Sequence, residues 1–96
     1  MMYFCNYPFF SDSGCFEGYK LIPGDIPGDG QIQGGVQTDE EGCARICHFN
    51  KDCCSFEQSL SENLCNMNND CKPTTGANKG FKFCVKGECV NGVNQK

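Results

Sequence analysis

The chain has 96 residues and a formal net charge of −4, and ten of its residues are cysteines. This length suits one compact domain with a marginal apolar core, and so high and even a cysteine count is typical of a disulfide scaffold made in an oxidising, extracellular compartment. Eight basic against twelve acidic residues, with no basic cluster, argue against nucleic acid, heparin or an anionic membrane as the main partner.

The first third of the chain predicts short strands separated by turns. Residues 1–14 form an apolar N-terminal segment that Cys5 would tether; its apolar run is too short to span a bilayer, so we expect no membrane insertion. Residues 16–22 predict a strand. In residues 23–30 the sequence Pro-Gly-Asp occurs twice, which favours two tight turns over a helix. Residues 31–36, with two glycines, predict a short strand or a bulge.

Residues 38–49 predict the helix of the domain. Thr38 as N-cap and Glu41 three positions later predict a capping box, and further carboxylates in the first turn suit the positive end of the helix dipole. The packed face of this helix is expected from the spacing i, i+3, i+4 and consists of Cys43, Ile46 and Cys47.

Three further strands are predicted from alternating polar and apolar residues, at 53–59, 64–68 and 80–85. Phe56 is the expected buried anchor of the first of these strands. Residues 69–79 are predicted to form a loop, in which Cys71 serves as a tether. Residues 86–96 are predicted to form a polar tail that Cys89 would hold.

The helix carries two cysteines, Cys43 and Cys47, which lie one turn apart. On a regular helix two such residues do not easily bridge each other, so each must reach a different neighbouring strand. Cys53 is the nearer partner for Cys47, and Cys65 lies within reach of Cys43. The spacing therefore predicts a helix stapled twice to a sheet.

Three motifs resemble the core of PAN/apple domains. They are Thr38-x-x-Glu41-Gly42-Cys43-x-x-x-Cys47, Cys53-x-x-Phe56 and Cys65-x-Met67. The resemblance covers residues 15–85 and implies an α+β fold, a small disulfide-rich domain in which an antiparallel sheet of about five strands packs on one α-helix. The bridges that it implies are Cys43–Cys65, Cys47–Cys53 and, between the first and last strands, Cys15–Cys84.

The remaining cysteines depart from the family pattern. Cys54 directly follows Cys53, and adjacent residues of a strand face opposite sides, so Cys54 needs a partner on the other side of the sheet. We pair it with Cys71. Cys5 and Cys89 then remain, and would join the two tails. The sequence leaves open that Cys53 and Cys54 exchange roles.

No motif indicates an enzyme, a cofactor or a metal site. His48 is the single histidine, and its position at the end of the helix is better explained by the helix dipole than by catalysis. The cysteine spacing does not match the paired C-x2-C knuckles of structural zinc sites. Asp25 and Asp29 lie in a glycine-rich loop that lacks the EF-hand pattern, so calcium is an alternative that we do not favour.

The resemblance implies recognition of an extracellular protein or a carbohydrate, so we predict a secreted, non-enzymatic binding module. The candidate ligand-binding residues are Glu57, Asn66 and Asn68, expected to face outward on the central strands, Arg45 on the helix, Lys72 in the long loop, and Tyr19 as an aromatic face. Two alternatives remain. One is a structural protein of an extracellular matrix, mineral-associated or adhesive layer. The other is a small inhibitor or toxin whose 23–30 loop blocks its target.

Overall fold

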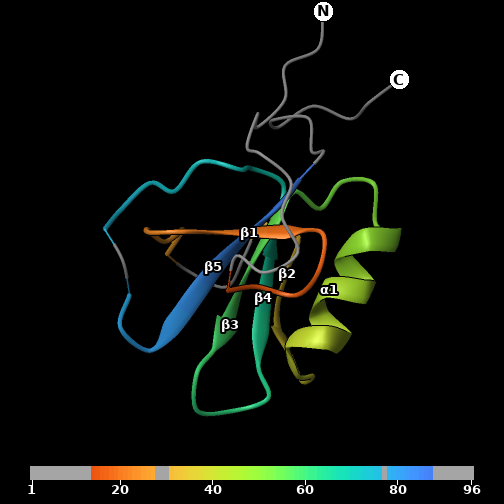
Figure 1. The fold of residues 1–96 in the computed structure, drawn as a ribbon, viewed down its shortest axis with the longest axis horizontal. Coiled ribbons are helices and arrows are strands. Elements are labelled where there is room, and N and C mark those ends of the chain that lie inside the picture. Colours follow the sequence, from red (N-terminus) through yellow and green to blue (C-terminus); the bar gives the residue numbers. More distant parts are fainter. Residues whose placement is uncertain (1–13, 28–30, 77, 88–96) are drawn as a thin grey trace, which may run out of the picture.

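A computed structural model describes residues 14–27, 31–76 and 78–87 of this chain. Its elements are β1 (Tyr19–Ile22), β2 (Gln33–Val36), α1 (Glu40–Phe49), β3 (Ser55–Ser59), β4 (Cys65–Asn68) and β5 (Phe81–Lys86). The strands form one antiparallel sheet in the order β1-β5-β3-β4-β2, and α1 packs on one side of it (Figure 1). The predicted fold class, a small disulfide-rich α+β domain with five strands on one helix, is confirmed.

The strands lie where the sequence predicted them, within one residue. Four of them fall inside their predicted ranges, and β5 is shifted by one residue. β2 is irregular, because its register against β4 shifts between Gln33 and Val36. Gly35 takes a positive φ of 67° there, a conformation that glycine adopts without steric cost.

The described residues contain no helix with the length and apolar character needed to cross a bilayer.

The start of α1 differs from the prediction. Asp39, and not Thr38, is the N-cap: its Oδ1 accepts a hydrogen bond of 2.9 Å from the backbone N–H of Gly42. The predicted capping box is also wrong, because Glu41 turns along the helix and accepts hydrogen bonds from Arg45, the shorter at 2.8 Å. An aspartate at this position satisfies a free N–H and adds negative charge at the positive end of the helix.

The packed face of α1 is rotated from the predicted one. The residues of α1 that are buried are Cys43, Ala44 and Cys47. Ile46 is 43% exposed and Phe49 is 83% exposed, so Ile46 does not belong to the packed face. Two disulfides draw the cysteines toward the sheet, and the backbone oxygen of Ala44 accepts a hydrogen bond from Tyr19 on β1. Covalent and polar contacts therefore set the orientation of this helix.

Three disulfides join described residues, and they are the three bridges that the resemblance implied. Their Cα–Cα distances are 6.4 Å for Cys43–Cys65, 5.2 Å for Cys47–Cys53 and 6.0 Å for Cys15–Cys84, within the usual range. The first two tie α1 to β4 and to the segment that precedes β3. The third ties the segment before β1 to β5.

The prediction for Cys54 is wrong. Among the described parts of the chain, no disulfide joins Cys54 to Cys71, although both are buried in one apolar cluster on the side of the sheet opposite α1. Cys54 does face the side opposite Cys53, as the strand geometry predicted. The predicted bridge between Cys5 and Cys89 lies outside the described residues.

Both faces of the sheet are covered. On the α1 side, Phe56 and Met67 are fully buried, and the ring of Tyr19 meets Phe56 edge-on at 5.1 Å. On the other side, Phe83 and Val85 pack with residues of two loops. Figure 1 shows α1 on one side and the long loop between β4 and β5 on the other. The central strand β3 is therefore buried on both faces.

Two loops cover the outer face because they pair with each other. The backbone N–H of Asp25 donates to the carbonyl of Thr75 at 3.2 Å, and the N–H of Thr75 returns a hydrogen bond of 3.1 Å to the carbonyl of Asp25. Thr74 donates to the same Asp25 carbonyl at 2.9 Å. These bonds give each loop backbone partners, and they hold the side chain of Ile26 against the sheet.

Candidate functional site

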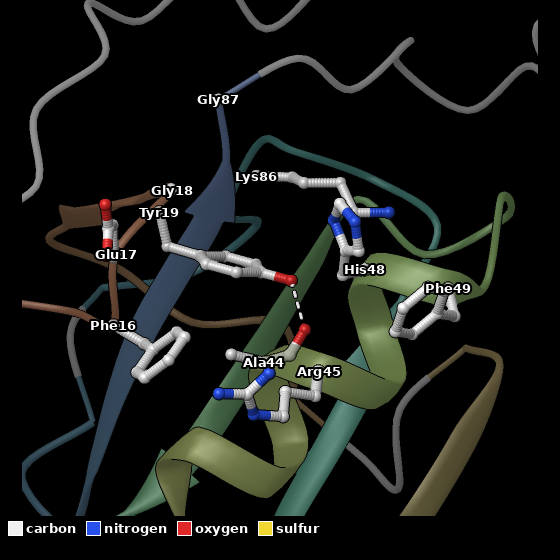
Figure 2. A pocket seen from close by; sticks show the side chains of 10 residues that line it. All are labelled: Phe16, Glu17, Gly18, Tyr19, Ala44, Arg45, His48, Phe49, Lys86 and Gly87. Atoms are coloured by element: carbon white, nitrogen blue, oxygen red, sulfur yellow. Dashed lines mark hydrogen bonds between the residues drawn. The ribbon is translucent and has the colours of Figure 1, made fainter.

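A groove of about 690 Å³ lies between α1 and the end of the sheet where β1 pairs with β5. We call it the α1–β1 groove. Figure 2 shows the ten residues that line it: Phe16, Glu17, Gly18, Tyr19, Ala44, Arg45, His48, Phe49, Lys86 and Gly87. They come from the segment before β1, from β1, from α1 and from the end of β5, so three elements must be assembled to make it.

Tyr19 and Ala44 form the floor of the groove. The hydroxyl of Tyr19 donates a hydrogen bond of 2.6 Å to the backbone oxygen of Ala44, which ties β1 to α1 (Figure 2). Tyr19 is only 4% exposed, and burial raises the pKa of its hydroxyl, so this donor stays protonated. The floor is fixed in place before any ligand arrives.

One wall of the groove is built by Phe16 and Arg45. The guanidinium carbon of Arg45 lies 5.6 Å from the centre of the Phe16 ring, a cation–π distance. Arg45 also pairs with Glu41 at 2.8 Å on the exposed surface of α1. The planar guanidinium and the aromatic ring therefore present one continuous surface.

The opposite wall carries His48, Phe49 and Lys86. The rings of His48 and Phe49 meet edge-to-face with centroids 4.9 Å apart. Lys86 is partly buried, and its Nζ donates a hydrogen bond of 3.2 Å to the backbone oxygen of Asn50. Burial lowers the pKa of this ammonium group, since the charged form loses hydration.

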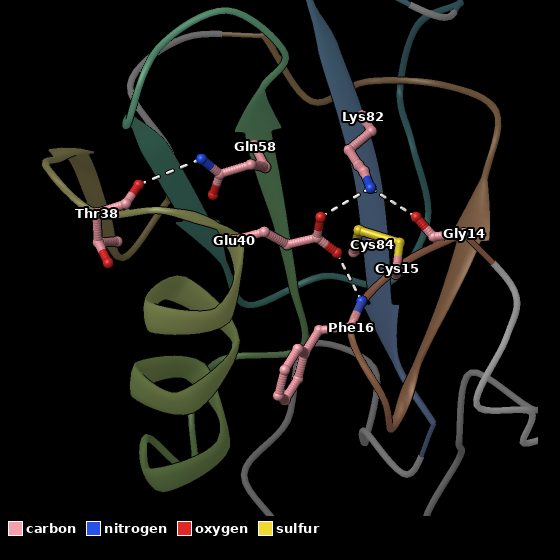
Figure 3. Close-up of polar contacts among 8 residues, drawn as sticks. All are labelled: Gly14, Cys15, Phe16, Thr38, Glu40, Gln58, Lys82 and Cys84. Carbon is pink, nitrogen blue, oxygen red and sulfur yellow. Dashed lines mark hydrogen bonds and ion pairs between the residues drawn. A yellow bond between two sulfur atoms is a disulfide. The ribbon is translucent and has the colours of Figure 1, made fainter.

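Glu40 holds the segment that carries Phe16. One carboxylate oxygen accepts a hydrogen bond of 2.6 Å from the N–H of Phe16, and the other pairs with Lys82 at 2.8 Å (Figure 3). Lys82 in turn donates to the carbonyl of Gly14 at 2.6 Å. This network places Phe16 beside the helix and so positions one wall of the groove.

The side chains of Cys15, Glu40 and Cys84 come close enough together to suggest a metal site. The two sulfur atoms form a disulfide, however, and both oxygens of Glu40 already have partners. A sulfur atom in a disulfide is not the thiolate that binds metal ions. The cluster is therefore explained as part of the structure that supports Phe16.

Two of the predicted site residues lie in this groove, Arg45 in a wall and Tyr19 in the floor. Tyr19 is buried, so it does not offer the open aromatic face that we expected from it. Lys72 is exposed on the long loop and is not among the residues that line the groove. The structure therefore brings together only part of the predicted set.

The prediction that residues of the two central strands form a surface site is wrong. Glu57 is 2% exposed and Asn68 is fully buried under the two loops. Asn66 is partly buried, and its Oδ1 accepts a hydrogen bond of 2.8 Å from the N–H of Gly35. The alternation correctly placed these residues on the face opposite α1, but that face is covered rather than exposed.

Glu57 is instead the polar centre of the outer face. Its Oε2 accepts hydrogen bonds from the N–H of Ile26 at 3.1 Å and from the amide of Asn68 at 3.0 Å. Its Oε1 is buried and accepts no hydrogen bond from the described residues. Burial, with a smaller effect from the charge of Asp25, raises the pKa of Glu57 to about 7.

Sequence patterns alone did not identify Phe16, Phe49 and Lys86 as groove residues. Strand alternation contains a signal for Lys86, since it places this lysine on the same face of β5 as Cys84. For Phe49 the signal is its position outside the spacing of the helix cysteines.

Comparison of the chain with models of protein families, with curated proteins and with solved structures finds no match. The function must therefore be argued from the geometry of this groove.

Proposed function

We propose that this protein is a secreted, non-enzymatic recognition module of the PAN/apple type that its cysteine pattern resembles, and that it binds a glycan or an extracellular protein in the α1–β1 groove. The observation that carries the proposal is the groove itself, which joins aromatic and hydrogen-bonding side chains on a fixed floor. Ligand sites in proteins combine apolar walls with a few placed polar groups in this way.

The exposure of Phe49 supports binding at this place. A phenylalanine that is 83% exposed presents its apolar surface to water, and burying such a side chain against a ligand releases about 2 kcal/mol. Phe49 stands at the rim of the groove beside His48, where a bound molecule would cover it (Figure 2). Rigid aromatic side chains at a rim are effective contact residues, because they lose little conformational entropy on binding.

The disulfides support both secretion and recognition. Such bridges form and persist in oxidising compartments outside the cytosol. Two of them hold α1, which contributes to both walls of the groove, and the third holds the Cys15 segment next to Phe16. A site held rigid in this way loses less entropy when it binds a ligand.

An inhibitory role for the 23–30 loop has less support. In its described part, Asp25 and Ile26 are buried, and Asp25 is hydrogen-bonded to the other loop. An inhibitor loop must project from its scaffold to enter a target, and this part of the loop covers the sheet instead.

The proposal is tested with the folded protein on a glycan array and in binding assays against extracellular proteins. Phe49→Ala should weaken binding about tenfold, as expected for an aromatic contact residue at a ligand site. The matched control is Leu60→Ala, which removes an apolar side chain that is 60% exposed on the β3–β4 hairpin, away from the groove. Equal losses in the two variants, or none in Phe49→Ala, would contradict the proposal.

A further inference from the structure

The α1–β1 groove is more basic than the chain as a whole. The protein has a net charge of −4, yet the lining of the groove includes Arg45, Lys86 and the single histidine, His48, against one carboxylate, Glu17. The sequence shows no basic cluster because Lys86 lies on β5, far along the chain from Arg45 and His48 on α1. Folding brings them to one hollow.

Lys86 has surroundings that a lysine seldom has. β5 carries two lysines on the face toward α1, Lys82 and Lys86, and they flank Cys84. Lys82 pairs with the carboxylate of Glu40 at 2.8 Å. Lys86 is also partly buried, but among the described residues its ammonium group has no carboxylate partner: it donates to the carbonyl of Asn50 at 3.2 Å, and the influence of Cys54 offsets only part of the cost of burial. A partly desolvated cation without a paired carboxylate is costly, so an anion placed here would be bound favourably.

The lining beside Lys86 also suits a sugar ring. Gly18, Ala44 and Gly87 leave the middle of the groove without long side chains, and Phe16 and Phe49 offer aromatic carbon at its two sides (Figure 2). Arg45 contributes less to anion binding, because two of its N–H groups already bind Glu41. Lys86 has donors to spare, since an ammonium group carries three.

We propose that the ligand of the α1–β1 groove is an acidic sugar, whose carboxylate or sulfate group binds the ammonium of Lys86 while its ring packs against Phe49. This inference rests on the proposed function and names the ligand class for the same site. The anion compensates the ammonium group of Lys86 for the hydration that burial removes. A neutral sugar of the same shape leaves the ammonium without a counter-ion and binds more weakly.

The test uses an array of glycans printed in matched acidic and neutral forms: sialylated and desialylated, uronate and carboxyl-reduced, sulfated and desulfated. Affinities for the best pair are then measured in solution by calorimetry. We expect the acidic form to bind at least about tenfold more tightly, as a charge-assisted hydrogen bond allows, and the difference to shrink as salt is added. The uronate and sulfate arms distinguish the two sources of negative charge.

Three variants make the test specific to Lys86. Lys86→Gln should bind the acidic form no better than the neutral form, whereas Lys86→Arg should keep most of the preference. Lys79→Gln is the control, because it removes the same charge from an exposed position outside the groove. Circular dichroism and thermal melting establish that each variant is folded.

The inference is overturned if neutral forms bind as tightly as acidic ones, or if Lys86→Gln keeps the preference. If neutral glycans bind and Phe49→Ala abolishes that binding, the inference of an acidic ligand is refuted, but the proposed function is not. No binding of any glycan, acidic or neutral, would refute the inference, and failure of the protein-binding assays as well would refute the proposed function.

Discussion

Glu57 shows how strongly one carboxyl group depends on its surroundings. It is buried between β3 and the loops, with hydrogen-bond donors on one oxygen and none from the described residues on the other. From β4 it is faced by the neutral Asn68, from β5 by the apolar Phe83, and from the 23–27 loop by the like-charged Asp25. The protonated form suits this site, because burial penalises the charged carboxylate.

This environment predicts a pH dependence of stability. The pKa of Glu57 rises from 4.5 to about 7 on folding, so the folded state holds a proton that the unfolded state releases. The contribution to the free energy of unfolding is therefore full below pH 4.5 and is lost as the pH rises toward 7, by roughly 3 kcal/mol. Glu57→Gln, which mimics the protonated acid, should abolish this loss in urea unfolding measured from pH 4 to 8.

The control for this prediction is Glu62→Gln, at an exposed position on the β3–β4 hairpin. It should reproduce the pH profile of the unmodified protein. If the profiles of Glu57→Gln and the unmodified protein remain parallel across this range, Glu57 is not the group that titrates.

The start of α1 carries a glycine that helix propensity alone would replace. Alanine is favoured over glycine inside a helix by about 1 kcal/mol. A Cβ at Gly42, however, would overlap Oγ1 of Thr38 and approach Oδ1 of the N-cap Asp39 to 3.2 Å. The absence of a side chain at this position lets the chain before the helix fold back over its first turn.

We therefore expect Gly42→Ala to lower the free energy of unfolding by about 1 kcal/mol or more, as overpacking does. In a Thr38→Ala background the same change should be less destabilising, because the overlapping oxygen is gone although the Cβ of residue 38 and Oδ1 of Asp39 remain close. Urea unfolding of the four proteins in this double-mutant cycle measures the coupling. If Gly42→Ala has the same effect in both backgrounds, the close approach of Thr38 Oγ1 is not the reason for a glycine at this position.

The three disulfides that join described residues differ in the length of chain they close. The sequence separations are 69 residues for Cys15–Cys84, 22 for Cys43–Cys65 and 6 for Cys47–Cys53. Loop-closure entropy then predicts losses of about 4, 3 and 2 kcal/mol when each pair is replaced by alanines. Urea unfolding of the three double variants gives the order directly, and a largest loss for the shortest loop would contradict the entropic account.

The described part of the domain has little apolar core apart from its cystines. Among the described residues, the large, fully buried apolar side chains other than cysteine are Phe56, Phe83, Met67 and Val85, while Glu57 and Asn68 fill much of the outer face. So few buried apolar side chains do not offset the chain entropy of a domain of this size. Stability must therefore come largely from the covalent bridges.

Reduction of the disulfides should accordingly unfold the domain near room temperature. A thiol-free phosphine reductant, followed by thermal melting and near-ultraviolet circular dichroism, measures the loss of tertiary structure. A reduced protein that kept its tertiary signal and its melting temperature would show that the core suffices without the bridges.

How far the fold could be predicted depends on how local each feature is. The strands and the helix follow from alternation and spacing along short stretches of chain, and Cys43–Cys65 and Cys47–Cys53 join elements that lie close in sequence. The N-cap could have been Thr38 or Asp39 on composition alone, because both residue types cap helices. Which of the two residues caps the helix depended on the path of the chain before it.

Composition and cysteine spacing were enough to establish a small α+β domain held by disulfides, because a chain of 96 residues forms only a marginal core without such bridges. Two features depended on contacts between distant segments: the covering of the outer face, which buries Glu57 and Asn68, and the gathering of Phe16, Arg45 and Lys86 around one hollow. Alternation states which face of a strand a residue takes, but not whether another segment covers that face. Whether a face is covered depends on packing between segments that lie far apart in the sequence, and a local pattern carries no information about such contacts.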